Sequence, residues 1–246
     1  MKKKNNTRWY VYGIILVICL WQVWAMALHR PIIPAPWQVA GNFVQIFVPK
    51  LSVHVLYSVW RLVAGLSLAI AAGIPLGLCM GYFSQWDKVL APVIYLIYPI
   101  PKVALLPVFM VLFGLGEESK ILMIFFIVVF QVTVAVRDGV KEIPQETYYS
   151  LYSLGASKIA VFREILIPAS LPKILTSLRV AMATAVSVLF FTETFGTQYG
   201  MGYFIMDAWM RVNYPEMYSG ILALSITGLL LFGLIDYAET RLCRWL

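Results

Sequence analysis

The stretch SLGASKIAVFREILIPASLP, residues 153–172, is a polar and regularly patterned interruption between two long hydrophobic segments of the chain. Gly155 is expected to break the helix that precedes it, and Ser157 is a suitable N-cap for the segment KIAVFREIL. Pro168 is expected to end that segment. The stretch therefore predicts a short helix between two breaks, and its purpose depends on the segments on either side.

The composition of the chain indicates whether this short helix belongs to a soluble protein or to a membrane protein. Apolar residues make up 61% of the 246 positions and charged residues 13%, whereas soluble domains average about 45–50% and about 25%. A helix needs roughly 20 apolar residues to cross the hydrocarbon core, and a membrane β-barrel would instead show short alternating strands. The chain is therefore predicted to be an all-α, polytopic membrane protein.

Hydrophobic runs of membrane length divide the chain into about six spans. The predicted spans are 9–28, 55–81, 89–115, 119–137, 173–193 and 217–237. We expect one transmembrane domain, 1–246, in which an N-terminal helix and outer loop, 1–54, precede a core bundle, 55–240. The cytoplasmic loop of that bundle is predicted to be 138–172.

The first span allows two interpretations. Its basic start and the triplet Ala25-Met26-Ala27 are typical of a cleaved signal peptide. Its full spanning length and its three tryptophans favour a retained helix. After it, the proline-rich segment 29–52 predicts an outer loop and then a short amphipathic helix at the membrane surface.

The positive charges predict how the chain is oriented, because Lys and Arg gather in the short cytoplasmic loops of membrane proteins. The ends and loops on one side carry Lys2, Lys3, Lys4, Arg8, Lys88, Lys141, Lys158, Arg163, Lys173, Arg241 and Arg244. The opposite loops carry Arg30, Lys50, Lys120 and Arg211. Both termini are therefore predicted to be cytoplasmic. The net charge of +7 is read as a topology signal, and no nucleic-acid partner is predicted.

Small residues recur at every fourth position of the second span. They are Gly65, Ala69, Gly73, Gly77 and Gly81. A ridge without bulky side chains lets another helix approach closely. It fits tight static packing inside the bundle, and it also fits a sliding or dimer contact, so the sequence leaves both interpretations open.

The third span is unusual because prolines at positions 92, 99, 101 and 107 surround Lys102. Proline removes a helical hydrogen bond, and a broken helix at membrane depth is tolerated where it is buried in protein or lines a water-filled cavity. Lys102 is expected to face a pathway, to pair with a carboxylate, or to lie near the cytoplasmic boundary. Its place in the first half of the span favours the last.

Other polar residues inside the predicted spans raise the same choice between structure and function. Arg61 and Glu193 are expected near the outer ends of their spans, where the geometry allows a salt bridge between them. Arg179 is expected shortly inside the cytoplasmic end of its span. For all three, holding the bundle together is favoured over contact with a solute. Thr184 and Ser187 suit a polar pore lining, although hydrogen bonds to their own helix carbonyls explain them equally well.

The short helix of the opening stretch has an apolar side. Ile159, Phe162 and Leu166 recur at i, i+3 and i+7 and are expected to share one face. The helix is predicted to lie parallel to the membrane on its cytoplasmic side. Because an isolated helix of this length is marginal in water, its presence predicts a docking partner.

Enzyme motifs are absent from the sequence. It contains no H-E-x-x-H, no G-x-S-x-G and no G-x-x-x-x-G-K-[ST] phosphate-binding loop. The chain is therefore predicted not to be an enzyme, to hold no cofactor or metal of its own, and to depend on a separate chain for any use of ATP. Its three cysteines form no C-x-x-C pair and predict no disulfide.

The opening stretch also carries a specific resemblance. Gly155, followed after nine residues by the letters ILIP at 165–168, resembles the E-A-A-x3-G-x9-I-x-L-P loop motif of ABC importer permeases, the binding-protein-dependent transport inner-membrane family. Further segments resemble its nitrate, taurine and aliphatic sulfonate branch. They are PAPWQV, SVWRLVAGLSLAIAAGIPLG, IPKVALLPVFMVLFGLGEESKI, LPKILTSLRVAMATAVSVLFFTET and GMGYFIMDAW.

One half of the loop motif departs from the family pattern. The Glu-Ala-Ala positions are occupied here by Tyr149, Ser150 and Leu151, so the acidic residue is missing. Glu146, one turn earlier, is the candidate to substitute for it.

The resemblance implies a homodimeric, multi-pass permease of the bacterial inner membrane that imports a small solute such as a sulfonate, taurine, nitrate or a similar organic compound. It implies a cytoplasmic ATPase dimer, which would hold ATP and Mg²⁺, and an extracytoplasmic solute-binding protein, which segment 197–218 would face. The residues implied in coupling to the ATPase are Gly155, Ala156, Ser157, Ile159, Phe162, Ile165 and Pro168. The candidates for the pathway or outer gate are Arg61, Lys102, Arg179, Thr184, Ser187, Glu193, Gly200 and Gly202. A secondary transporter or channel without an ATPase is the alternative.

Overall fold

The structure is a computed structural model that describes residues 7–28, 30–153 and 155–244. Within these ranges every regular element is a helix, which confirms the predicted fold class. The α-helices are α1 (Thr7–Leu28), α2 (Pro36–Ile46), α3 (Ser52–Tyr82), α4 (Ser84–Ile97), α5 (Leu106–Phe113), α6 (Glu117–Lys141), α7 (Gln145–Ser153), α8 (Lys158–Val161), α9 (Ile167–Glu193), α10 (Met201–Met210) and α11 (Tyr214–Leu242). Shorter turns are the π-helical η1 (Phe47–Leu51) and η3 (Phe162–Leu166) and the 3-10 turn η2 (Lys102–Leu105).

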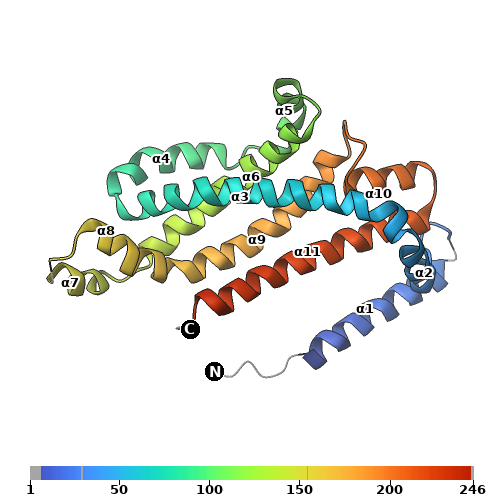
Figure 1. Cartoon of the computed structure of the whole chain (residues 1–246), viewed down its shortest axis with the longest axis horizontal. Coiled ribbons are helices and arrows are strands. Elements are labelled where there is room, and N and C mark those ends of the chain that lie inside the picture. The colour runs from blue at the N-terminus through green and yellow to red at the C-terminus, as the bar shows by residue number, and fades with distance from the viewer. Residues whose placement is uncertain (1–6, 29, 154, 245–246) are drawn as a thin grey trace.

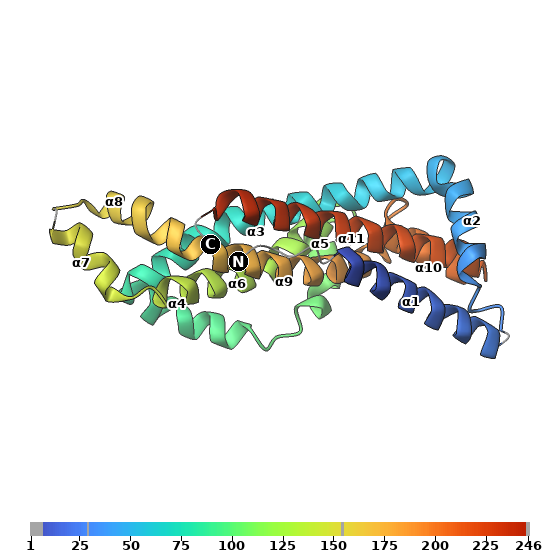
Figure 2. The same ribbon diagram turned by 90° about the horizontal axis from the view of Figure 1, so that it is seen from below.

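Long helices form the body of the molecule. In Figure 1, α3, α6, α9 and α11 run along the long axis, and α6 contacts both α3 and α9 while α11 contacts α9. Helices α7 and α8 project from one end of this bundle, and α2 and α10 lie at the other end (Figures 1 and 2). The coupling candidates in α8 therefore lie at the opposite end of the bundle from α10, where the candidates Gly200 and Gly202 lie.

The membrane spans agree with the predicted number. The segments long and apolar enough to cross a membrane are Val11–Leu28, Pro36–Tyr82, Glu117–Lys141, Lys158–Glu193 and Tyr214–Leu242. A sixth span results if α4 and the segment Lys102–Phe113, bent by 80° at their break, count together. The break falls in the proline-rich span where the sequence predicts it. The second and fifth spans begin earlier than predicted because η1 joins α2 to α3 and η3 joins α8 to α9.

The glycine ridge of the second span packs inside the bundle. A Cβ added to Gly77 would lie 2.6 Å from the carbonyl oxygen of Thr133 on α6, and one added to Gly81 would lie 2.5 Å from Cβ of Val140. Both distances are far shorter than a carbon contact allows, so α3 and α6 are in direct backbone contact here. The structure therefore places the ridge in tight packing inside the bundle.

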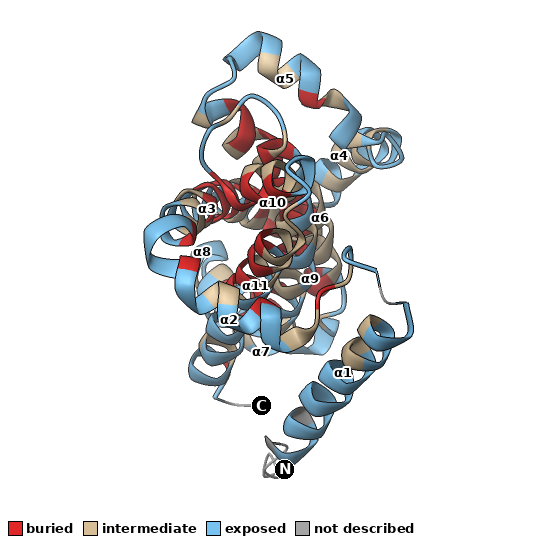
Figure 3. Cartoon of the chain, turned by 90° about the vertical axis from the view of Figure 1, so that its right-hand side faces the viewer, coloured by how far each residue is buried: buried red, intermediate tan, exposed pale blue. Residues whose placement is uncertain are grey.

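Buried side chains concentrate between α3, α6 and α9, whereas the outer helices expose apolar surface. Ile124, Val128 and Val132 on α6 are 0% exposed and lie in the centre of the core. Figure 3 shows this buried centre and also shows α1, almost entirely exposed, standing apart from the bundle. Exposed apolar helices are expected in a protein whose solvent is lipid.

The structure of the α7–α9 region shows that one prediction, a short helix that ends at Pro168, is wrong. Helix α7 ends as expected, because Gly155 has φ +71° and its N–H bonds to the carbonyl of Tyr152 (3.0 Å). Pro168, however, does not end the following helix, which continues from α8 through η3 into α9. In η3 the N–H of Ile167 bonds to the carbonyl of Phe162, five residues back. This wider turn accommodates a proline that has no N–H to donate, so the predicted separate short helix is instead the first part of a long one.

Candidate functional site

The α7–α8 loop comprises residues 145–166. Its base, at Tyr152 and Phe162, packs against Tyr82 of α3, and its tip, around Ile159, is exposed. Ser157 caps α8 as predicted, because its Oγ accepts the N–H of Ala160 (3.3 Å). Beside this cap, the Ile159 side chain is 80% exposed. The loop therefore presents an apolar side chain beyond the end of the bundle, where none of the described residues covers it.

The apolar stripe predicted for this loop is wrong in part. Leu166 is fully buried, but Ile159 points away from the bundle instead of sharing its face. Val161 and Ile165 are buried in its place. The i, i+3, i+7 spacing assumes a regular α-helix, whereas the π turn η3 changes the angular positions after Val161.

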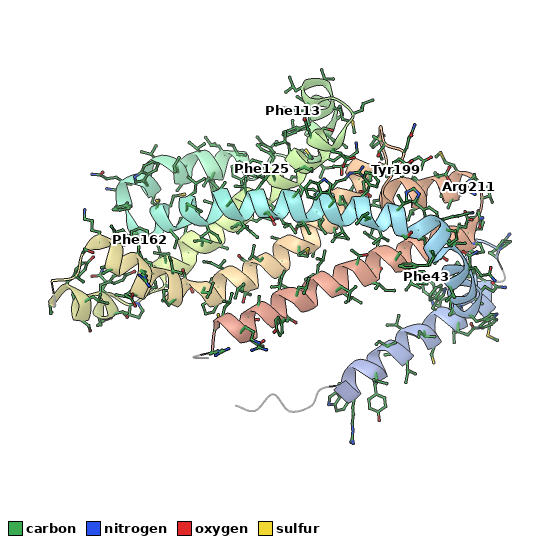
Figure 4. The ribbon with its side chains drawn as sticks, in the orientation of Figure 1. Phe43, Phe113, Phe125, Phe162, Tyr199 and Arg211 are labelled. Carbon is green, nitrogen blue, oxygen red and sulfur yellow. The ribbon has the colours of Figure 1, made fainter. Side chains whose placement is uncertain are left out.

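An aromatic cluster connects the loop to the end of α3. The hydroxyl of Tyr82 lies 2.9 Å from the hydroxyl of Tyr152 on α7, and its ring packs edge-on against Phe162 at 5.1 Å. Figure 4 shows Phe162 at this end of the bundle. Burial raises the pKa of the neighbouring Tyr148 above its ordinary value, so Tyr148 stays neutral at physiological pH. Tyr82 thus touches the helices on both sides of Gly155.

A second cluster lies near the opposite end of the bundle, and we name it the Arg61 cluster after its central residue; its members are Ser58, Arg61, Glu117 and Glu193. The guanidinium of Arg61, 1% exposed, donates from Nε and Nη2 to Glu117 (2.6 Å each). Its Nη1 donates to Glu193 (2.8 Å), which confirms the predicted salt bridge. Planar two-point pairing of this kind is the strong form of an ion pair.

The Arg61 cluster also caps α10. The fully buried carboxylate of Glu193 accepts the N–H of Gly202 (2.9 Å). The hydroxyl of Ser58 lies 2.8 Å from both Glu193 oxygens and accepts the N–H of Met201 (2.8 Å). The first backbone donors of α10 are therefore satisfied by side chains of α3 and α9, and the negative carboxylate also suits a helix N-terminus.

Glycines form the predicted bend between α9 and α10. Gly200 has φ +137°, which side chains with a Cβ rarely adopt. A Cβ on Gly202 would lie 2.4 Å from the carbonyl oxygen of Phe190. Next to the bend, the buried ammonium of Lys120 is held by the carbonyls of Leu115 (2.6 Å) and Gly116 (2.9 Å).

Lys102 does not lie near the end of its span, as the sequence favours, but deeper. Its ammonium lies over the ring of Phe130 (5.6 Å), which is halfway along the 25-residue α6. It also lies over the ring of Tyr98 (5.1 Å) and donates to the Tyr98 carbonyl (3.1 Å). The break in the span, rather than sequence distance from its start, places this lysine at depth.

The remaining pathway candidates make contacts within the bundle. Arg179 contacts Asp236 and Glu239 on α11 (2.7 Å to Glu239), as expected of a charge that holds helices together. Thr184 and Ser187 donate to the carbonyls four residues before them, at 3.4 and 3.1 Å. Arg61, Lys102 and Arg179 are thus in three separate environments. No metal site can be formed from His, Cys, Asp and Glu within the described ranges.

The comparisons with known proteins decide the family. Residues 69–244 match the family described as binding-protein-dependent transport system inner membrane component. The chain belongs to this family. It is 31% identical to the taurine transport system permease protein TauC of Escherichia coli (strain K12), over 94% of this chain and 86% of that protein. It is 28% identical to the formylaminopyrimidine transport permease protein ThiX of Halalkalibacterium halodurans, over 94% and 93%.

Two further matches agree with this assignment. The permease is 26% identical to the putative aliphatic sulfonates transport permease protein SsuC of Bacillus subtilis (strain 168), over 99% of this chain and 91% of that protein. Its fold resembles a chain of the MetNI methionine ABC transporter in an inward-facing conformation, with a TM-score of 0.63 and 17% identity over 78% of this chain and 93% of that one. The protein is thus the membrane-spanning permease of an ABC importer, and the alternative of a secondary transporter or channel is not favoured.

Several residues of the permease that matter structurally were not singled out by the sequence. Ser58 carries no local signal, because its partners lie on other elements. Lys120 counts in the sequence only as a charge of the outer loops, whereas the structure buries it in the first turn of α6. Glu117 has one weak signal, its place in the first turn of α6, which favours an acidic residue but does not name Arg61 as its partner.

Proposed function

We propose that two copies of this permease assemble with a separate cytoplasmic ATPase dimer and receive a small polar organic solute from an extracytoplasmic binding protein. The observation that carries the proposal is the α7–α8 loop, whose exposed Ile159 stands on a capped turn at the end of the bundle. Ile159 follows Lys158 in the charged loop at this end of the bundle, and we expect an apolar side chain in this place to be covered by a partner protein. ATP and Mg²⁺ are expected on the ATPase chain.

The proposed orientation places the α7–α8 loop and both termini in the cytoplasm. Lys158 and Arg163 lie in the loop, and Arg211 and Lys50 lie near the Arg61 end, where both bond to Glu216. The lysines at positions 2, 3 and 4, which contribute to the orientation prediction, lie outside the described residues. Glu146, exposed in the first turn of α7, is proposed to replace the acidic residue missing from the loop motif.

Coupling is proposed to run through the Tyr82 contacts and the continuous helix α8–η3–α9. Residues 155–159 would meet the ATPase, while Phe162, Ile165 and the following turn would fix the loop to the bundle. ATP can shift the conformation of the permease only if the ATPase contacts differ between two states. A loop fixed at its base and free at its tip fits that requirement.

The test is co-purification of the permease with the candidate ATPase, comparing the wild type with Ile159→Asp. The matched control is Ile32→Asp. Ile32 is an exposed isoleucine in the connection between α1 and α2, outside the membrane-spanning segments. We expect Ile159→Asp to remain folded and to lose the ATPase, while Ile32→Asp retains it. Equal retention by both variants would contradict the proposed contact, and no association with folded wild type would contradict the proposed assembly.

A further inference from the structure

Lys102 differs from Arg61, Arg179 and Lys120 in how its charge is compensated. Arg61 is neutralised by two carboxylates, and Arg179 by two others. Lys120 is held by several backbone carbonyls. Among the described residues Lys102 has one carbonyl, that of Tyr98, and two aromatic rings. Aromatic faces attract a cation without cancelling its charge, so the ammonium stays available to an anion.

The depth of Lys102 rules out a lipid headgroup as its ordinary partner. The part of α4 inside the predicted span, residues 89–97, covers about 13 Å of a hydrocarbon core about 30 Å thick. The position of Phe130 in the middle of α6 gives the same depth. An uncompensated lysine there costs roughly 2.5–3.5 kcal/mol on an insertion scale.

The backbone around Lys102 indicates what it faces. Residues 98–101 are not helical, and Tyr98 and Ile100 expose nearly half of their surface. Irregular backbone within the hydrocarbon region occurs only where protein buries it or where it lines a water-filled cavity. This segment must therefore face a second copy of the chain or the solute pathway.

A second unsatisfied polar group lies at the same depth. Gln131, which follows Phe130 on α6, has a buried side-chain carbonyl oxygen without a hydrogen-bond partner among the described residues. Its amide nitrogen bonds only weakly to Thr184 on α9 (3.4 Å). Buried polar groups without partners are rare. The Gln131 carbonyl oxygen is therefore available to accept a hydrogen bond from a polar molecule in the middle of the bundle.

We propose that Lys102 is a solute-binding residue of the pathway and holds the negative group of a small organic sulfonate as it crosses the membrane. The proposal rests on the proposed function and specifies its solute. Among the solutes in the names of the relatives, taurine and aliphatic sulfonates carry a permanent sulfonate charge, and formylaminopyrimidine does not. The Lys102 ammonium meets no carboxylate among the described residues, which favours the former, because an anion would add the missing countercharge.

The test uses vesicles that contain the permease assembled with its ATPase, supplied with the binding protein and ATP. Uptake of labelled taurine and ethanesulfonate is measured for the wild type, Lys102→Met and Lys102→Arg. The matched control is Lys88→Met, which alters an exposed lysine near the start of the same broken span. ATP hydrolysis and ATPase co-purification are measured on the same samples.

We expect Lys102→Met to lower the maximal uptake rate about tenfold or more, because a hydrogen bond to a charged group contributes about 1.5–3 kcal/mol. The apparent KM should stay unchanged, since the binding protein captures the solute. Lys102→Arg should keep most of the uptake, Lys88→Met all of it, and ATPase association should be unaffected in every variant.

Three results would overturn the proposal. The first is wild-type uptake by Lys102→Met. The second is loss of dimer or ATPase assembly in that variant, which would show that Lys102 serves assembly instead of solute binding. The third is a wild-type complex that hydrolyses ATP in response to its binding protein but takes up neither sulfonate, in which case the proposed function stands and the solute class falls.

Discussion

The Arg61 cluster and the α7–α8 loop occupy opposite ends of the same bundle and are stabilised in opposite ways. In the cluster, Arg61 and Glu193 are almost completely buried, and charged groups satisfy each other and the start of α10. In the loop, aromatic contacts at Tyr82 and Phe162 fix the base, and Ile159 at the tip is exposed. Buried ion pairs hold the helices together at one end, whereas the other end exposes an apolar side chain that no described residue covers.

The two regions also cap their helices differently. Helix α8 is capped by Ser157, its own preceding residue. Helix α10 begins after Gly200, which has no side chain, and takes its cap from Ser58 and Glu193, 143 and 9 residues away in sequence from the donors they serve. A change in the cluster should therefore affect the whole bundle, while a change in the loop should affect only the loop.

The largest effect is expected for Arg61→Ala. Removing one partner from a buried ion pair costs about 3–5 kcal/mol because the other charge is left uncompensated, here Glu193. We expect a large fall in the unfolding temperature of the detergent-solubilised permease and in its yield. Arg179→Ala, which breaks a more exposed pair on α9 and α11, should cost about 1 kcal/mol or less. Equal losses would show that the Arg61 cluster is not the more tightly held site.

A pair of glycines gives the next largest contrast. Gly202→Ala places a methyl group 2.4 Å from the Phe190 carbonyl oxygen and should cost about 1–3 kcal/mol of overall stability. Gly155→Ala meets no atom within 4 Å, but it must adopt φ +71°, at about 1–2 kcal/mol. We expect this strain to shift only the conformation of the loop, because Gly155 packs against no other helix. ATPase binding should therefore weaken about 5- to 30-fold, and the unfolding temperature of the bundle should not change. A lowered unfolding temperature for Gly155→Ala would remove the distinction between the two regions.

The features that could be predicted from the sequence are those that depend on local contacts, and the features that could not depend on distant ones. The break at Gly155, the cap at Ser157 and the interruption around Lys102 depend on neighbouring residues, and the structure confirms them. The pairing of Arg61 with Glu193 was also foreseen, because both charges had to lie near the same ends of their spans.

The errors and omissions come from contacts that no local pattern encodes. The exposure of Ile159 depends on how η3 winds, and the depth of Lys102 depends on where the broken span turns. The cap on α10 joins Ser58 to Met201 across 143 positions. Periodicity describes one helix at a time, so it cannot identify the neighbour that supplies a missing hydrogen bond.

Two serines test the contrast in capping with smaller changes. Ser58→Ala leaves the buried N–H of Met201 without an acceptor, a cost of about 1–3 kcal/mol, and should speed amide exchange at the start of α10. Ser157→Ala removes an exposed N-cap, at about 1 kcal/mol, and should speed exchange only in the α7–α8 loop. Ser170→Ala, a buried serine on α9 that bonds to its own helix, is the control. Faster exchange in α10 for Ser157→Ala would contradict local capping.

The smallest effect is expected for Pro168→Ala. If this proline ended a helix, its replacement would let the helix lengthen and would reorganise the loop. In the structure the helix already continues through Pro168, because η3 takes up the missing hydrogen bond before it. Alanine should therefore change stability by no more than about 0.5 kcal/mol, with ATPase co-purification unchanged. The informative measurement is amide exchange at residues 162–170, where the restored N–H should slow exchange slightly as the wide turn tightens. A marked loss of ATPase binding would show that the π turn η3 itself shapes the surface that binds the ATPase. The shape of the loop would then depend on the backbone of η3, whereas the Arg61 cluster depends on side-chain contacts.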